Sequence, residues 1–287
     1  MNRKYNLFFV GLSKNCYETL KKNLNFLLSF EKNYDLHSTI IVIDSDSIDG
    51  TKQFCKDLEN KFDNFLFVEK DFSEETSLNR IEKLALCRNI GINKINDEFE
   101  TIYIPMDMDI DLFKFVNNKD FFELINNFEN NDDLSAIFPF TIPFYYDIFA
   151  LRSKGWVENN STLIAHNFKK RFKLGSFFFN YYYVFSKMKS INEFSEELIN
   201  VESAFGGIGM YKLKPKLTYE YTVDENESNF VSEHISFNSQ FDKSYILKKW
   251  NTPSPEEYIF YKNYNYLNKF KYILKTIKYD VLRIFEK

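Results

Sequence analysis

Residues 39–51 read TIIVIDSDSIDGT and pass from an apolar run through a polar turn into a helical pattern. The run 39–43 is rich in β-branched residues, which is typical of a strand covered on both faces of a parallel sheet. Asp49 and Gly50 then suggest a turn, after which we expect a helix over 51–62. This passage from strand to helix is one half of a βαβ unit.

The same alternation continues on both sides of this stretch. The apolar periodicity predicts strands and helices in turn, namely strands over 5–10, 65–68 and 101–105 and helices over 17–30 and 77–93. Such alternation predicts an α/β fold with a mostly parallel sheet flanked by helices. Ligands of these sheets bind beyond the carboxyl ends of the strands, so the residues after Val10, Ile43 and Pro105 are the place to look for a site.

The second half of the chain is richer in aromatic residues. It predicts a helix over 121–128, a strand over 136–141 and two strand candidates within 200–221, and its pattern is helical beyond Phe241. No internal repeat or low-complexity linker interrupts it. We therefore expect one domain over 1–240 and a C-terminal helical extension over 241–287.

Composition excludes several classes of protein. The chain has 287 residues, of which 44% are hydrophobic and 19% aromatic, so it can bury a core and is not disordered. A net charge of −4 argues against nucleic acid as a partner. The three cysteines have no metal-binding spacing, which suits a reducing compartment. With no apolar run of the roughly 18 residues that span a bilayer, we expect a cytoplasmic protein.

The last 26 residues predict an amphipathic helix with a basic face. Residues 262–287 contain seven cations and two carboxylates. A helix of this kind can anchor a protein on anionic lipid, at the inner face of the cytoplasmic membrane, or can dock on the core or at a dimer interface. The aromatic run 177–185 could join such a surface, but we expect it to be buried in the core.

The sharpest local feature is TIYIPMDMDID at residues 101–111. An apolar strand there ends in alternating carboxylates, and Asp107 and Asp109 can share a face. Their oxygens suit Mg²⁺ or Mn²⁺, with a substrate phosphate completing the coordination. The pair could also be Asp109 and Asp111, and the alternative to a metal site is a solvated acidic loop.

Two further features could contact a ligand. Asp44 ends the strand 39–43, where a carboxylate can accept hydrogen bonds from a base or ribose, whereas Asp49 is better explained as a helix-cap or turn residue. Three of the eight glycines of the chain lie within residues 205–209, FGGIG. Glycine permits close approach of the backbone to a ligand, and a bulged strand explains the cluster equally well.

Several of these motifs together resemble the GT-A glycosyltransferases, whose fold is Rossmann-like. Residues 42–51 (VIDSDSIDGT) are similar to their VVDDGSTDGT-type segment, 107–109 (DMD) to their DxD motif and 87–91 (CRNIG) to their ARNxG segment. Ser45 and Asp46 stand where that segment usually has Asp-Gly. Residues 145–152 (YYDIFALR) resemble the YYDxxALR stretch of the cryptococcal-type capsule mannosyltransferases, and 203–211 (SAFGGIGMY) and 233–234 (EH) follow in that group's order.

The resemblance implies transfer of a sugar from a nucleotide-diphosphate donor to a hydroxyl of an acceptor, such as a capsule, lipopolysaccharide or lipid-linked oligosaccharide. A divalent ion, Mn²⁺ or Mg²⁺, would act as a Lewis acid on the leaving diphosphate. The implied metal ligands are Asp107, Asp109 and His234, with Asp107 nearer the ribose. Glu233 and Asp147 are the implied catalytic carboxylates, with Glu233 as general base.

The remaining residues implied by the resemblance would hold the donor. They are Asp44, Asp46, Arg88, Asn89, Asp107, Arg152, Gly206 and Gly207. The residues leave three structural alternatives open. Arg88 could pair with a nearby Glu, Asp147 and Arg152 could form an internal ion pair, and His234 could be a hydrogen-bonded core residue.

Two other functional classes compete with the transferase. A phosphatase of the haloacid dehalogenase type also places DxD after a strand, but after the first strand of its core, whereas three expected strands precede Asp107 here. A catalytically silent binding or scaffold protein with the GT-A fold is the non-enzyme alternative. A dehydrogenase is disfavoured because residues 9–14, FVGLSK, lack the GxGxxG fingerprint.

Overall fold

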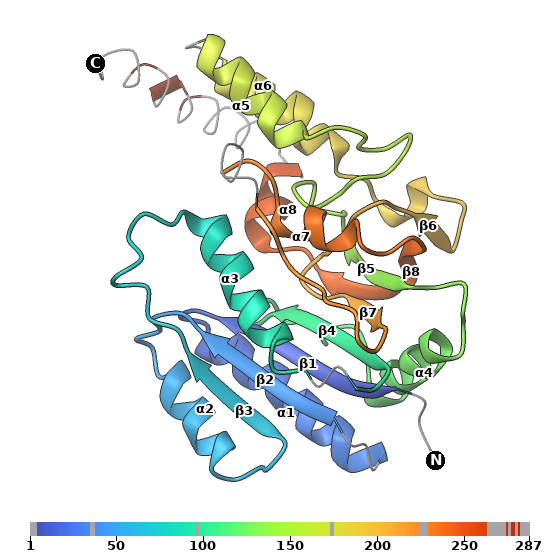
Figure 1. Ribbon diagram of the computed structural model, residues 1–287. Coiled ribbons are helices and arrows are strands. Elements are labelled where there is room, and N and C mark those ends of the chain that lie inside the picture. Colours follow the sequence, from blue (N-terminus) through green and yellow to red (C-terminus); the bar gives the residue numbers. More distant parts are fainter. Residues whose placement is uncertain are drawn as a thin grey trace.

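The computed structural model describes residues 5–34, 38–95, 98–172, 175–223 and 229–262, together with residues 274, 277, 278 and 281. Within these residues the chain forms an eight-stranded sheet with helices on both faces (Figure 1). The strand order is β3-β2-β1-β4-β7-β5-β8-β6. Of the seven pairings between neighbours, four are parallel and three antiparallel. The expected α/β fold with a mostly parallel sheet is confirmed.

The N-terminal half supplies four parallel strands. The strands are β1 (Asn6–Ser13), β2 (Ser38–Asp44), β3 (Phe65–Glu69) and β4 (Thr101–Asp107), and the helices are α1 (Tyr17–Tyr34), α2 (Thr51–Glu59), α3 (Arg80–Ile92) and α4 (Asn118–Glu129). Successive strand residues point to opposite faces of a sheet. Phe9 and Val42 accordingly pack in a core with α1, α2 and α4, while Val10 and Ile43 pack in a second core under α3. Both faces are covered, which explains the continuous apolar runs.

Helix α3 approaches the sheet closely at Gly91. A Cβ atom at this position would lie 2.4 Å from Cγ1 of Val10 and 3.2 Å from Cδ1 of Ile43. Arg88 precedes Gly91 by three residues and therefore lies on the same side of the helix. The close contact at Gly91 thus brings the Arg88 side chain down toward the sheet.

The C-terminal half adds the mixed part of the sheet. The strands are β5 (Ala136–Ile142), β6 (Leu198–Asn200), β7 (Met210–Leu213) and β8 (Ser244–Pro253), and the helices are α5 (Ser161–Arg171), α6 (Ser176–Tyr183), α7 (Glu233–Asn238), α8 (Glu256–Lys262) and the short 3₁₀ helices η1 (Phe185–Lys187) and η2 (Ile191–Glu193). Strand β7 is antiparallel to both β4 and β5, so β5 and β8 run in the same direction as β4. The carboxyl ends of both halves therefore meet at one edge.

The helical pattern predicted beyond Phe241 is wrong for residues 244–253, which form β8 and pair with β5 and β6. The register jumps within this strand: Pro139 pairs with Leu247, but Phe140 pairs with Asn251. This irregularity interrupts the period-2 alternation by which a strand is identified. Helix begins only at Glu256. Most of the basic stretch 262–287 lies outside the described residues.

The expected burial of the aromatic run 177–185 is wrong in part. Phe185 is buried, but Phe178 and Tyr182 on α6 are 65% and 66% exposed. The periodicity of α6 explains the division, because Phe179 and Tyr183 turn inward onto Phe168 of α5 while Phe178 and Tyr182, one residue earlier in each case, turn outward. Among the described residues, no helix is both long enough and apolar enough to cross a bilayer.

Candidate active site

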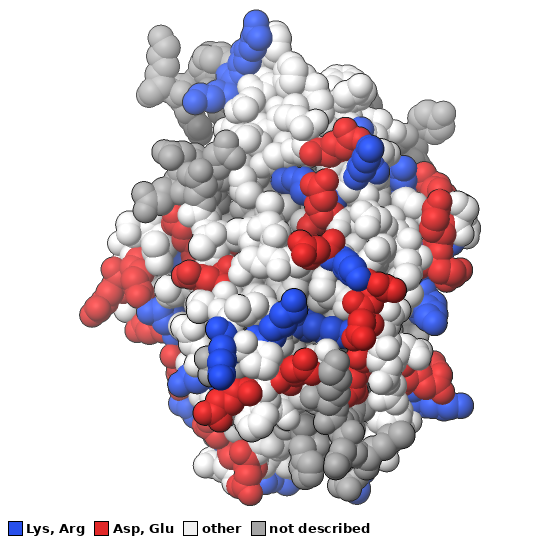
Figure 2. Space-filling view, turned by 45° about the vertical axis from the view of Figure 1, so that its right-hand side comes forward, with Lys and Arg blue, Asp and Glu red and all other residues white. Residues whose placement is uncertain are grey.

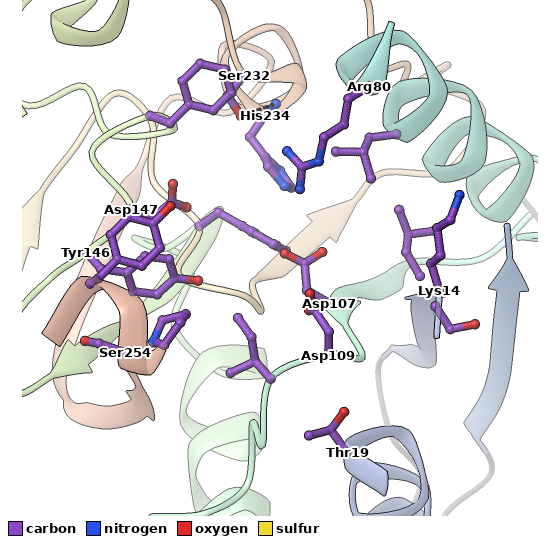
Figure 3. A pocket seen from close by; sticks show the side chains of 18 of the residues that line it. Lys14, Thr19, Arg80, Asp107, Asp109, Tyr146, Asp147, Ser232, His234 and Ser254 are labelled. Carbon is purple, nitrogen blue, oxygen red and sulfur yellow. Dashed lines mark hydrogen bonds between the residues drawn. The ribbon is translucent and has the colours of Figure 1, made fainter. Parts of the chain in front are cut away.

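A cleft of about 1280 Å³ opens at the carboxyl edge of the sheet (Figure 3). Residues at or just after the ends of five strands line it, namely Lys14 after β1, Ser45 after β2, Asp107 in β4, Pro143 after β5 and Ser254 after β8. The starts of α3, α7 and α8 contribute Arg80, His234 and Tyr258 among others. The location agrees with the general rule for ligand sites in α/β sheets. It also draws on both halves of the chain.

Asp107 and Asp109 lie in the middle of this cleft (Figure 3). Between them Met108 is fully buried and packs against Gly11, so the two carboxylates point to the cleft. Partial desolvation by the surrounding protein raises the pKa of Asp109, and the negative charge of Asp107 raises it further. The Asp109 side chain is nevertheless exposed to the cleft. Asp111 also lines the cleft, but its carboxylate lies 3.3 Å from Nζ of Lys22.

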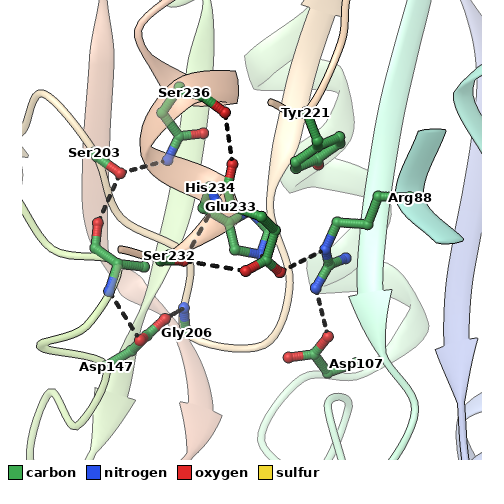
Figure 4. A network of polar contacts seen from close by, with 12 residues as sticks. Arg88, Asp107, Asp147, Ser203, Gly206, Tyr221, Ser232, Glu233, His234 and Ser236 are labelled. Atoms are coloured by element: carbon green, nitrogen blue, oxygen red, sulfur yellow. Dashed lines mark hydrogen bonds and ion pairs between the residues drawn. The ribbon is translucent and has the colours of Figure 1, made fainter. Parts of the chain in front are cut away.

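Arg88 joins the carboxylate of Asp107 to that of Glu233 (Figure 4). Its Nη2 donates to Oδ1 of Asp107 at 2.7 Å and its Nε to Oε1 of Glu233 at 3.0 Å. The guanidinium is 2% exposed and lies 4.8 Å from the ring centre of Phe205. Burial opposes its charge, but the two carboxylates hold the pKa of Arg88 well above its usual value. The ion pair with a Glu, left open by the sequence, is therefore the arrangement found.

His234 presents a neutral imidazole to the cleft. It lies in the first turn of α7, is 3% exposed, and stacks on Phe205 with ring centres 3.7 Å apart. Burial and then the charge of Arg88 lower the pKa of His234 well below its usual value. Within the described part of the chain neither ring nitrogen has a hydrogen-bond partner. A buried polar atom without a partner is costly, so such an atom on a cleft points to a ligand.

Both oxygens of Glu233 are engaged. Besides Arg88 at Oε1, its Oε2 accepts a hydrogen bond from the Ser232 hydroxyl at 3.4 Å, and the side chain is 4% exposed. Glu233 lines the cleft from α7 next to His234. Glu233 therefore both lines the cleft and holds the Arg88 side chain in place through their ion pair.

Asp147 lines the other side of the cleft and joins the glycine cluster to the segment that follows β5. Its Oδ2 accepts from the Gly206 amide at 3.1 Å and its Oδ1 from the Ala150 amide at 3.3 Å. Burial raises the pKa of Asp147 to about 6. Nη1 of Arg152 donates to the carbonyls of Leu151 at 2.6 Å and Phe149 at 3.4 Å, so an ion pair with Asp147 is not the arrangement found. Donor binding by Arg152 stays a prediction.

Gly206 and Gly207 adopt positive φ angles of 74° and 90°. A Cβ atom would lie 2.9 Å from Cγ2 of Thr141 at Gly206 and 2.9 Å from Cδ1 of Ile110 at Gly207. The Gly207 carbonyl accepts from the Asp107 amide at 2.8 Å. These glycines therefore form a tight turn that fixes the backbone of Asp107, and the Gly206 amide is used by Asp147.

Two expected donor-binding residues, Asp44 and Asn89, have internal partners. Asp44 is fully buried, and its carboxylate accepts hydrogen bonds from Ser13 and Ser47. Asn89 exchanges two hydrogen bonds with the backbone of Tyr221, at 2.9 and 2.8 Å. Asp46 adopts a positive φ of 61° in the turn after β2. The neighbouring Ser45, rather than these residues, is the part of this turn that lines the cleft.

Apart from Arg88, sequence reasoning missed the cations of the cleft. Lys14, Arg80, Lys83 and Lys114 line it, and Lys14 and Arg80 are exposed. Lys14 directly follows a strand, so the strand-end rule could have identified it. Arg80 opens α3 behind its cap Asn79 and has no motif of its own. Figure 3 shows Lys14 and Arg80 on the side of the cleft opposite Tyr146 and Asp147.

The described residues contain no group of three or more His, Cys, Asp or Glu side chains arranged to hold a metal ion. Asp107, Asp109 and His234 line one cleft without forming a closed cage. Mg²⁺ and Mn²⁺ sites often use one or two carboxylates and leave the remaining positions to water and substrate phosphates. The oxygen and imidazole donors present fit an open site of that kind.

No protein-family model matches the chain, and no curated protein matches its sequence. The membership of the capsule mannosyltransferase group therefore stays a prediction. Among solved structures, residues 1–349 of S. aureus TarS match with a TM-score of 0.45 and 9% identity, over 96% of this chain and 65% of that one. Mannosyl-3-phosphoglycerate synthase from Rubrobacter xylanophilus matches with a TM-score of 0.41 and 12% identity, over 97% and 72%.

A third similar structure is the mannosyltransferase PcManGT from Pyrobaculum calidifontis, with a TM-score of 0.42 and 12% identity, over 88% of this chain and 57% of that one. The chain spans 44% of the Mycobacterium tuberculosis glucosyl-3-phosphoglycerate synthase, with a TM-score of 0.34 and 16% identity. This chain also covers less than two thirds of the length of the TarS structure.

Proposed function

We propose that the chain is a divalent-metal-dependent glycosyltransferase that moves a sugar from a nucleotide-diphosphate donor to an acceptor hydroxyl. The observation that carries this proposal is that one cleft at the carboxyl edge of the sheet holds both the Asp107 and Asp109 carboxylates and the imidazole of His234. Neither ring nitrogen of His234 makes a hydrogen bond within the described residues, although Nε2 lies 3.5 Å from Oε1 of Glu233. Exposed cations on the same cleft, Lys14 and Arg80, suit the phosphates of such a donor.

Asp109 and His234 are the groups that would bind the metal. Asp109 is exposed to the cleft and His234 is neutral, as a metal-ligating imidazole must be. An imidazole ligand favours Mn²⁺ over Mg²⁺. When bound, the ion would neutralise charge on the departing diphosphate. Asp107 is held by Arg88 and by the hydrogen bond that its backbone amide donates to the Gly207 carbonyl, and these contacts fix its place beside Asp109 and suit it to orient the donor.

Asp147 is our candidate for the general base toward the acceptor. It lines the cleft, and a pKa of about 6 leaves it ionised at neutral pH while it is basic enough to accept a proton. Glu233, the other expected catalytic carboxylate, is in an ion pair with Arg88 and is better suited to position Arg88 and His234. The acceptor that we propose is a surface glycan or a lipid-linked oligosaccharide, as the capsule-type motif suggests.

The test is a ligand-dependent shift in melting temperature. A ligand that binds only the folded chain raises its melting temperature by mass action. UDP, GDP, CMP and dTDP are tested with and without Mn²⁺; solved structures of the M. tuberculosis synthase and of PcManGT contain UDP with Mn²⁺ and GDP-Man with Mn²⁺. We expect one diphosphate to raise the melting temperature only when Mn²⁺ is present.

Variants assign the effect to the site. Asp109→Ala should abolish the Mn²⁺-dependent shift, because it removes a carboxylate ligand, whereas Asp111→Ala should retain it, because Asp111 is paired with Lys22. Loss of the shift in both variants would place the metal on Asp109 and Asp111, and retention in Asp109→Ala would contradict the proposed metal site. No shift with any nucleotide would favour the catalytically silent scaffold.

A further inference from the structure

Helices α5 and α6 form a hairpin at one end of the molecule, at the top of Figure 1. The two helices are tied together on their inner side, where Phe168 stacks on Phe179 and Tyr183 with ring centres 5.4 and 5.3 Å apart. Nζ of Lys169 also donates to Oδ1 of Asn180 at 3.0 Å. The hairpin thus has its own aromatic interior and a definite outer face.

The outer face is aromatic. Four rings on or beside the hairpin are strongly exposed: Phe172 47%, Phe178 65%, Tyr181 43% and Tyr182 66%. Phe178, Tyr181 and Tyr182 are spaced by three and four residues on α6 and so occupy one side of it. Clustered exposed aromatic residues are uncommon on a surface that faces only water and mark an interaction site.

The charge of this segment is opposite to that of the whole chain. Residues 159–192 contain six Lys or Arg and no Asp or Glu, in a chain whose net charge is −4. Lys170 and Arg171, at the end of α5, are exposed, and the guanidinium of Arg171 lies 5.5 Å from the ring centre of Phe172. Figure 2 shows acidic and basic side chains interspersed over most of its face, but only basic ones among the described residues at its upper end.

We propose that the outward side of α6, with Phe178, Tyr181 and Tyr182, and the basic end of α5, with Lys170 and Arg171, dock together on an anionic lipid bilayer. Phenylalanine rings can enter the acyl boundary, while tyrosine rings place their hydroxyls at the headgroups. Lysine and arginine beside them are attracted by anionic headgroups. Residues 159–192 contain no carboxylate that an anionic surface would repel. An uncharged protein partner would not explain why cations are concentrated in this segment.

The test is co-sedimentation of the full chain with phosphatidylcholine vesicles, with and without phosphatidylglycerol. We expect binding to the anionic vesicles only, weakened by high salt. Phe178→Ser/Tyr182→Ser should lower the partition coefficient at least about fivefold, because it removes the inserted rings and leaves the charge. Lys170→Gln/Arg171→Gln should weaken binding and reduce its dependence on salt.

The matched control is Phe99→Ser/Leu217→Ser, which removes two side chains that are 56% and 54% exposed and line a pocket to which neither α5 nor α6 contributes. This pair should bind vesicles as the unaltered chain does. Residues 262–287 are present in every variant, so a difference between variants cannot come from their loss. Equal sedimentation of the Phe178/Tyr182 variant and the unaltered chain, or equal binding to neutral and anionic vesicles, would overturn the proposal.

Discussion

The buried Arg88 pairs with two carboxylates, that of Glu233, which is 4% exposed, and that of Asp107, which is 31% exposed to the cleft. Removing one partner of a buried ion pair leaves the other charge without compensation. We expect Arg88→Met to lower the free energy of unfolding by about 3–5 kcal/mol, measured by urea denaturation. Adding Glu233→Gln to Arg88→Met should restore part of this loss, because it removes the stranded charge. A loss below about 1 kcal/mol would mean that water reaches these groups and that the pair is unimportant for stability.

Asp147 should give the stability of the chain a distinct pH dependence. Burial raises its pKa from 3.8 to about 6, so between these values the folded state binds more protons than the unfolded state and stability falls as pH rises. This group contributes at most about 3 kcal/mol to that fall. Between pH 4 and pH 7, Asp147→Asn should therefore gain stability relative to the unaltered chain, as measured by urea denaturation at each pH. A difference that is constant over this range would contradict the raised pKa.

The turn between β6 and β7 shows how one short segment fixes the site. Gly206 and Gly155 share a φ of 74°, but a Cβ atom would lie 2.9 Å from Thr141 at Gly206 and meet nothing within 4 Å at Gly155. Both substitutions by Ala cost about 1 kcal/mol for the left-handed backbone. Gly206→Ala should cost a further 1–3 kcal/mol, roughly, for overpacking. Urea denaturation of the two variants checks this, and equal losses would show that the turn can move away from Thr141.

The elements differ in how far the sequence predicts them. Strands β1, β2 and β4 follow from apolar runs because both faces of the sheet are covered there, and Asp107 and Asp109 follow from the end of β4. Strand β8 is not predicted from the sequence, because the jump in its register interrupts the alternation of apolar and polar residues. Contacts such as Arg88 to Glu233 join residues 145 positions apart, and only the folded sheet brings them together. The cleft likewise gathers Lys14, which follows β1, and Arg80, which begins α3, and only the folded sheet brings these two residues to one site.

Strand β8 is part of the central sheet, although the predicted boundary at 240/241 places it outside the domain 1–240. Strand β8 lies between β5 and β6 and buries Ile246, Leu247 and Trp250. At its end Thr252 donates to the Gly206 carbonyl at 3.1 Å, and Ser254 just beyond lines the cleft. Stability and site are thus both coupled to residues 244–254, which a boundary at 240/241 would remove.

Truncation tests this coupling. A chain of residues 1–262 keeps every described strand and should melt cooperatively within about 4 °C of the full chain, a shift that corresponds to about 1 kcal/mol. A chain of residues 1–242 lacks β8, so β5 loses a parallel neighbour and the core loses Trp250. We expect it to lose cooperative melting and to bind a hydrophobic dye, as scanning calorimetry and dye fluorescence would detect. Cooperative melting of 1–242 would instead make residues 1–240 an independent domain, with β8 as an added edge.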